Sequence, residues 1–500
     1  MPLKVTQLLL AVLLVTAALS AEARLVVRMV QVAHRHGARG STAVEHSVDI
    51  CGTEYPCGEL TGVGIEMLNS VGRFVRARYS NLSLVEEPLI PSTRYNSSVV
   101  YTRSTGLQRT IQSATAFLSG LFPDDYFYPV VYSHNYTTDT FLTTDPTPYV
   151  FGRRSLEMDL MDAALNPIVD SYLSREQIAA AAKDAYIEDI CSDFTQRSNC
   201  AYRLYDVATS FEAAGRLSSR TNLVAAMPGL SAYMIGWYRY IYDYNKSVEL
   251  DRMQGSCAQN LAQTMLANID AHKLSPSFKL YEFSTHDTMV SPLAMTFGDH
   301  NNVTMNPPYA TTIIVELLQD TESPNDWYVR PVRGNPTRQA NGSYMFVLND
   351  MEVRCIDAAG NQYLATTGIC PLDGFRRMVD YSRPSVPNGQ CTLTPHQREN
   401  MGCPRTVADG KPVPYYCWLY RYVCPQTACP DGYVLGREDL QCYPLGPTTT
   451  PAPQPNSSPV PMAWTPRTMD PKKTKDTAVG LLRGVEEGVV LGSAIRKHGE

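Results

Sequence analysis

The stretch LVVRMVQVAHRHGAR, residues 25–39, joins an apolar run to a basic turn. Residues 25–33 are rich in Val and Leu, which predicts a buried strand. Directly after this strand, Arg35 and Arg39 flank His36. Open α/β sheets bind ligands at the carboxyl ends of their strands, and guanidinium groups match phosphate geometry with paired hydrogen bonds. We therefore expect an α/β fold with an anion site at this strand end.

Other interpretations of this turn are also open. Gly37 lets the backbone turn tightly and lets a ligand approach, but the same residues would also suit a solvated surface turn. His34 and His36 could form a His-x-His metal pair, although no acidic cluster nearby completes a metal site. We expect His34 to pack on or near the strand instead.

A second basic element follows the short strand predicted at residues 99–102. The T-x-x-Q pattern of residues 105–108 predicts a capping box that opens a helix. Arg103 then lies where a strand meets a helix N-terminus, a place that favours an anion. The alternative is an exposed arginine beside a helix cap. Arg109 falls one turn further into the helix, and we expect it to be a surface or structural residue.

A third element, His286 with Asp287, follows a strand predicted at residues 278–284. A histidine and a carboxylate again stand at a strand end. Asp287 could protonate a leaving group from there, or it could simply cap the next helix. Residues 312–319 predict a further strand.

The segments VAHRHGAR (32–39), YTRSTGLQRT (101–110) and FSTHDT (283–288) together resemble the histidine acid phosphatase family. The likeness spans roughly residues 25 to 350 and continues through LTGVGIEML and NPPYATTIIVEL. Among relatives, the chain is most similar to acid phosphatases of trypanosomatid parasites. The resemblance implies a phosphoglycerate mutase-like three-layer sandwich, in which helices flank a mostly parallel sheet.

The resemblance also implies a role for each motif residue. His36 matches the nucleophile, which forms a phosphohistidine, and Asp287 matches the proton donor. The remaining matches concern phosphate binding: Arg35, Arg39 and Arg103 form a clamp, and His286 makes a further contact. A carboxylic acid donor would explain a preference for acidic pH, and neither metal nor other cofactor is expected. One departure is visible, because Ser41 stands where the family often has Pro.

The expected activity is hydrolysis of small phosphomonoesters, with phosphoproteins as further partners and a homodimer as the assembly that the resemblance suggests. A phytase or another phosphatase of the same superfold is the alternative enzyme. The alternative from another class is a non-catalytic surface glycoprotein that binds phosphorylated ligands, against which the intact His36 and Asp287 argue. A net charge of -6 does not indicate a nucleic-acid partner.

Several features predict export. Residues 1–23 read as a signal peptide, with Lys4 before an apolar run and a small-x-small site at residues 21–23. The 13 cysteines include no CxxC pair, which favours disulfides with one thiol left over. Seven N-x-S/T sequons predict a glycosylated surface; they are Asn81, Asn96, Asn135, Asn245, Asn302, Asn341 and Asn456. We expect secretion or residence in an endosomal or lysosomal lumen.

The predicted organisation has three parts after the signal peptide. Residues 24–354 form the catalytic domain, which includes a helical insertion at about 155–269. Residues 355–446 form a Cys-rich, disulfide-stapled extension, and residues 447–500 a Pro/Thr-rich disordered tail without a membrane span. With 44% hydrophobic and 18% charged residues, the composition is typical of a folded enzyme.

Overall fold

The structure, a computed structural model, describes residues 24–44, 47–124, 128–404 and 413–445. The predicted signal peptide and the predicted tail from residue 447 lie outside the described residues. Within these ranges, no helix combines the length and apolarity needed to cross a bilayer.

A mixed sheet organises the fold, in the order β10-β6-β5-β1-β4-β2-β3, with β7 paired to β6. The central strand β1 is almost wholly buried, as its run of Val and Leu requires. The parallel part comprises β1 (Leu25–Arg35), β4 (Leu280–Thr285), β2 (Val100–Thr105) and β3 (Tyr132–His134). The antiparallel part comprises β5 (Thr312–Asp320), β6 (Trp327–Arg338), β7 (Tyr344–Asn349) and β10 (Cys370–Pro371).

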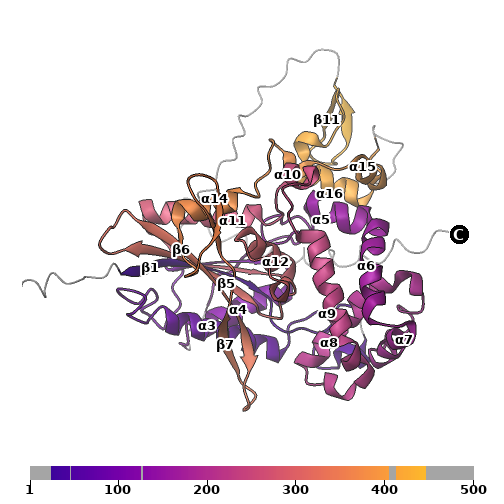
Figure 1. The fold of residues 1–500 in the computed structure, drawn as a ribbon, viewed down its shortest axis with the longest axis horizontal. Helices are drawn as coiled ribbons and strands as arrows, with labels where there is room; N and C mark the ends of the chain where they lie inside the picture. The colour runs from indigo at the N-terminus through magenta and orange to yellow at the C-terminus, as the bar shows by residue number, and fades with distance from the viewer. Residues whose placement is uncertain (1–23, 45–46, 125–127, 405–412, 446–500) are drawn as a thin grey trace, which may run out of the picture. The chain divides into compact units, whose positions relative to one another are not determined.

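Helices cover both faces of this sheet (Figure 1). One face packs on α3 (Gly62–Arg78) and α4 (Gln108–Leu121) through an apolar cluster that includes Val71 and Phe117. The other face packs on α11 (Gln259–Leu274), α12 (Asp287–Thr296) and α14 (Leu372–Asp380). This three-layer α/β arrangement confirms the predicted fold class. The short helices α2 (Val48–Cys51) and α13 (Asn302–Met305) lie in connections.

The predicted helical insertion has an apolar core of its own, which includes Leu204, Phe211 and Trp237. Its elements are α5 (Pro148–Phe151), the π-helix η1 (Gly152–Leu156), α6 (Met158–Tyr172), α7 (Arg175–Asp184), η2 (Phe194–Gln196), α8 (Arg197–Ala213), η3 (Leu217–Ser219), α9 (Thr221–Tyr242) and α10 (Glu249–Gln254). The last helix that we expected there, α11, packs instead on the sheet.

The Cys-rich region is divided between two cores. Its first part, with β8 (Arg354–Ile356), β9 (Gln362–Leu364), β10 and α14, joins the catalytic sheet or packs against it, so no structural boundary falls at residue 355. The rest has a small core around Cys417 and Tyr420. It comprises η4 (Gly389–Cys391), α15 (Pro395–Met401), α16 (Tyr415–Val423), η5 (Pro425–Thr427), β11 (Tyr433–Leu435) and β12 (Cys442–Pro444).

The cysteines pair as the odd count predicted. The disulfides are Cys51–Cys57, Cys191–Cys200, Cys355–Cys370, Cys391–Cys424, Cys403–Cys417 and Cys429–Cys442. Cys257 is the cysteine left over, and it is buried.

The predicted capping box at residues 105–108 does not form. Strand β2 runs on to Thr105, and α4 begins only at Gln108, with Leu107 as an N-cap whose side chain makes no capping hydrogen bond. The Thr105 hydroxyl is used elsewhere, since it lies 2.9 Å from Nε2 of His286. Because β2 is longer and α4 starts later than predicted, Arg103 lies inside the strand and Arg109 lies in the first turn of the helix.

Candidate active site

His36 directly follows β1, and its backbone is held between the end of β4 and the loop that leads into β5. Its N–H donates to the Thr285 carbonyl at 3.0 Å, and its carbonyl accepts from the Ala310 N–H at 3.0 Å. The imidazole Nδ1 lies 2.9 Å from the Gly37 carbonyl oxygen. Because a carbonyl can only accept, Nδ1 carries the proton and the lone pair of Nε2 is free. That is the tautomer of a nucleophilic imidazole.

The surroundings of His36 keep it neutral. Burial lowers its pKa well below the ordinary value, and the guanidinium groups of Arg109, Arg35 and Arg39 lower it further. The imidazole therefore stays unprotonated in mildly acidic solution.

The His286–Asp287 pair stands at the end of β4, next to His36. The rings of His286 and His36 meet edge to face with centroids 5.5 Å apart. Oδ2 of Asp287 lies 2.6 Å from Nη2 of Arg35. Burial by itself raises the pKa of Asp287, but Arg35 and the other cations outweigh it and hold that pKa below the ordinary value. In this arrangement the carboxyl is ionised.

Three buried guanidinium nitrogens around His36 lack a partner. The Nε atoms of Arg35, Arg39 and Arg109 form no hydrogen bond with any described residue. Burying a charged N–H donor without an acceptor is costly, so these atoms indicate where an anion is bound. Arg35 already pairs with Asp287 and Arg39 with Asp206, whereas no described carboxylate forms an ion pair with Arg109.

The assignment of Arg103 to this clamp is wrong. Arg103 points to Asp139, with Nη2 to Oδ1 at 3.1 Å, and its guanidinium lies over the Phe141 ring at 4.3 Å. The arginines that act on the His36 pKa do not include it. Since β2 runs on to Thr105, Arg103 lies inside the strand rather than at its end.

Arg109 takes the place that we predicted for Arg103, and its assignment as a surface or structural residue is also wrong. It lies in the first turn of α4, beside the carboxyl end of β2. Burial lowers its pKa, with Arg39 as the next cause, which reflects the crowding of cations around His36. The sequence could have indicated Arg109, because it is the second arginine of the same segment. A helix start later than the one we predicted puts it in the first helical turn.

The alternative metal site is not formed. His34 is fully buried in the sheet, with Nε2 3.0 Å from Oε1 of Glu282, so it packs on the strand as expected. Across the described part of the chain, no three His, Cys, Asp or Glu residues gather as potential metal ligands.

Comparisons with known proteins agree with this arrangement. A sequence profile of the histidine phosphatase superfamily (branch 2) matches residues 44–222. Over these residues the chain is similar to this superfamily. It is 26% identical over 331 residues to lysosomal acid phosphatase of Xenopus laevis, covering 62% of this chain and 70% of the relative. It is 25% identical over 382 residues to prostatic acid phosphatase of Rattus norvegicus, covering 73% and 88%.

Solved structures show the same fold. The phytase of Klebsiella sp ASR1 superposes with a TM-score of 0.50 at 17% identity, covering 73% of this chain and 98% of that chain. The phytase of Citrobacter braakii gives a TM-score of 0.50 at 16% identity, covering 74% and 100%.

Gly37 is needed for packing rather than for access by a ligand. A Cβ at Gly37 would lie 2.3 Å from the carbonyl oxygen of Gly64, and a Cβ at Gly64 would lie 2.2 Å from that of Ala38. The turn after β1 therefore rests directly on the first turn of α3. Only glycine allows this approach of two backbones.

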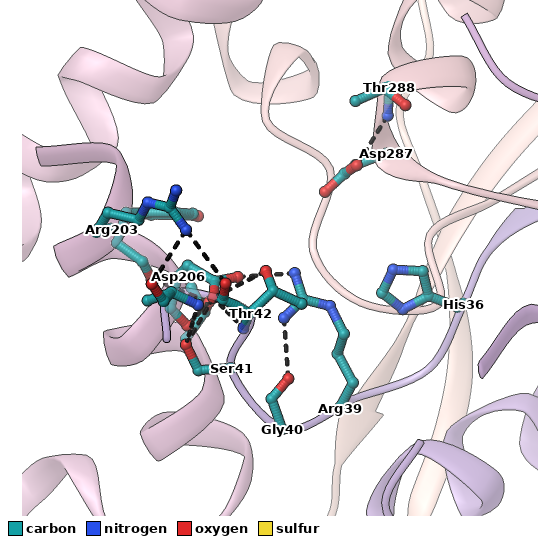
Figure 2. Close-up of polar contacts among 12 residues, drawn as sticks. His36, Arg39, Gly40, Ser41, Thr42, Arg203, Asp206, Asp287 and Thr288 are labelled. Carbon is teal, nitrogen blue, oxygen red and sulfur yellow. Dashed lines mark hydrogen bonds and ion pairs between the residues drawn. The ribbon is translucent and has the colours of Figure 1, made fainter. Parts of the chain in front are cut away.

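Sequence reasoning missed Asp206, which comes from α8 of the helical insertion. Its Oδ1 accepts from Nη2 of Arg39 at 2.7 Å, and its Oδ2 accepts from the Ser41 hydroxyl and the Thr42 N–H, each at 2.7 Å. Figure 2 shows this cluster, in which Arg203 also donates to the Thr42 carbonyl at 3.2 Å. Ser41, the departure from the family pattern, is thus used to anchor the loop that follows the clamp.

Asp206 makes the stability of the folded protein depend on pH. Burial alone would raise the pKa of Asp206, but Arg39 and the loop donors lower it from 3.8 to about 2. A carboxyl group whose pKa is lower in the folded state stabilises the fold fully at pH values above its unfolded-state pKa. This stabilisation is lost as the pH falls through the folded-state pKa. We expect the wild type to lose about 2 kcal/mol of unfolding free energy between pH 4 and pH 2 through this group.

The measurement is denaturant unfolding of wild type and Asp206→Asn across that pH range. Asp206→Asn is less stable at pH 5 and shows a flatter acid dependence. Asp431→Asn, at an exposed position, is the control and follows the wild type. Parallel acid dependences for wild type and Asp206→Asn contradict the assignment.

Proposed function

We propose that this protein is an acid phosphatase that hydrolyses phosphomonoesters through a phosphohistidine on His36. The observation that carries the proposal is a neutral, buried imidazole facing three guanidinium groups whose Nε atoms have no hydrogen-bond partner among the described residues. A phosphate dianion supplies the acceptors that these donors lack. The names of the relatives from Xenopus laevis and Rattus norvegicus support the same activity.

In the proposed first step, Nε2 of His36 attacks phosphorus in line with the ester oxygen. The P–N bond forms as the P–O bond breaks, and the arginines stabilise the charge on the equatorial oxygens. Asp287 donates a proton to the departing alkoxide. In the second step, Asp287 accepts a proton from the water that attacks the phosphohistidine, which releases phosphate and restores His36.

His286 is proposed as a donor to the phosphate. Its Nε2 lies 2.9 Å from the Thr105 hydroxyl, which in turn lies 2.7 Å from the Thr110 hydroxyl. When Thr105 donates to Nε2, the proton of the neutral ring is on Nδ1 and is available for a phosphate oxygen. The Thr105 hydroxyl therefore fixes the tautomer of His286 in which Nδ1 carries the proton.

The source of the proton on Asp287 follows from its pKa. Because Arg35 and its neighbours hold that pKa below the ordinary value, Asp287 is ionised at mildly acidic pH. A phosphomonoester monoanion, whose second pKa is about 6, brings a proton into the site. Transfer of that proton to Asp287 gives the substrate dianion and the protonated donor together.

The expected assay result is hydrolysis of p-nitrophenyl phosphate with kcat/KM that falls about tenfold per pH unit above pH 6, as the monoanion disappears. Activity persists in EDTA, because the arginines supply the positive charge, and falls with tartrate, as the family likeness implies. Loss of activity in EDTA, or a rate that rises through pH 8, contradicts the proposal. The control is the same assay on phenyl sulfate, which stays uncleaved.

A place in the secretory pathway is proposed with this activity. The disulfides of the described residues are typical of an oxidising compartment. The sequon asparagines that the structure describes are all exposed, as glycosylation requires; they are Asn81, Asn96, Asn135, Asn245, Asn302 and Asn341. Release into the medium or delivery to a lysosomal lumen both fit, and fractionation of cells and medium separates them.

A further inference from the structure

A cavity walled by aromatic rings lies beside the catalytic groups. Its volume is about 240 Å³. Drug-sized ligands occupy roughly 300–1,000 Å³, so this cavity suits a group of one or two rings. The lining rings are those of Tyr136, Phe151, Tyr415 and Tyr416.

One wall of the cavity is shared with the catalytic site. The ring of Tyr136 meets the ring of His286 edge to face, with centroids 5.4 Å apart. Thr144, next to the lining residue Asp145, donates to the Thr288 carbonyl at 3.2 Å. The chain segment that lines the cavity is thus bonded to the first turn of α12, where Asp287 is located. In-line attack by His36 sends the leaving oxygen toward this proton donor.

The two charged residues that line the cavity, Arg154 and Asp145, form an ion pair with each other. Nη1 of Arg154 lies 3.1 Å from Oδ1 of Asp145, and the Tyr136 hydroxyl donates to the other oxygen of that carboxylate at 2.5 Å. Arg154 stands on the π-helix η1, an irregularity that is frequent at functional sites. A paired arginine leaves no net charge for a second phosphate, so the cavity favours an uncharged, flat group.

The opposite wall comes from the Cys-rich extension. Tyr415 and Tyr416 open α16, and the ring of Tyr416 lies 5.8 Å from that of Phe151 on α5. Cys417, the next residue, is bonded to Cys403, and the small core of the extension includes Phe151 and Leu156. Figure 1 shows α16 beside α5. The extension thus holds its two tyrosines against the catalytic domain with a disulfide and an apolar core.

We propose that this cavity is the subsite for the leaving group and that the Cys-rich extension makes it selective for aryl phosphomonoesters. The proposal rests on the proposed function, since it takes the phosphate to lie at the arginine clamp. The ring of an aryl ester then stacks between Tyr416 and Tyr136. Small alkyl esters reach the same clamp without filling the cavity.

The test compares phenyl phosphate with glycerol 2-phosphate in wild type, Tyr416→Ala and Tyr422→Ala. The ratio of kcat/KM for the two esters falls about fivefold to tenfold in Tyr416→Ala, the loss expected for one aromatic pair. Tyr422 lies on the same helix, is exposed and does not line the cavity, so Tyr422→Ala keeps the wild-type ratio. If Tyr416→Ala does not fold, Tyr416→Leu keeps the apolar volume without the ring.

Binding of phosphonates separates this proposal from the proposed function. Calorimetry measures the preference of wild type and Tyr416→Ala for phenylphosphonate over methylphosphonate, which needs no turnover. Loss of that preference in the variant supports the subsite, even if the wild type hydrolyses no ester and the proposed function fails. An unchanged preference, an unchanged kcat/KM ratio, or an equal fall in Tyr422→Ala overturns the subsite while leaving the phosphatase assignment intact.

Discussion

His36→Ala abolishes turnover, with kcat reduced by about a thousandfold or more, as for other removed nucleophiles. The structure gives the reason, since His36 offers a free Nε2 while its Nδ1 is occupied by the Gly37 carbonyl. Rapid quenching of the wild type and labelled substrate in alkali recovers protein-bound label that is stable in base and is lost on later exposure to acid, as for a phosphohistidine. His36→Ala retains no such label.

The matched control is His34→Gln, two residues earlier and inside β1. Its imidazole faces Glu282 inside the sheet, so the change costs stability rather than the chemical step. Label recovered on serine or aspartate in the wild type, or substantial turnover by folded His36→Ala, contradicts the nucleophile assignment.

Arg109→Gln lowers kcat/KM by about a hundredfold to a thousandfold, the usual loss on removing one preorganised donor to a transition-state oxygen. Of the three arginines around His36, Arg109 alone has no described carboxylate partner, so its charge is fully available to a phosphate. The variant also weakens binding of inorganic phosphate, measured by calorimetry. Arg109→Lys rescues little, because an ammonium cannot form the paired hydrogen bonds of a guanidinium.

Arg103→Gln is the comparison that separates the two arginines of this segment. It removes the partner of the buried Asp139, which costs about 1–3 kcal/mol of stability, while kcat/KM stays close to the wild-type value. If Arg103→Gln instead loses activity as Arg109→Gln does, the geometry of the clamp described above is wrong.

The fold and most of the site were predictable because the motifs stand at strand ends. One predicted strand ends at Arg35 and His36, and another ends just before His286 and Asp287. The two strands pair in parallel, so their carboxyl ends and these residues lie side by side in the structure. The pattern could not fix which arginine of the second segment faces these strand ends. A shift of two residues in the start of α4 exchanges Arg103 for Arg109.

Asp206 was beyond sequence reasoning for a different reason. It stands 167 positions after Arg39 in the chain, on a helix whose periodicity reports only its buried face. The periodicity of a helix does not indicate which of its polar residues contacts a loop elsewhere in the chain. The same holds for Tyr416, whose partner Phe151 belongs to a separate part of the chain.

The backbone of His36 has a consequence for biosynthesis. The amide and carbonyl of His36 are hydrogen-bonded to Thr285 and Ala310. Most of the catalytic unit lies between His36 and these two residues in the sequence. A nascent polypeptide that has emerged only as far as the helical insertion cannot fix the imidazole in place. Contacts of such long sequence separation form late in folding. Newly made chains therefore stay inactive until the catalytic unit has closed around its first strand.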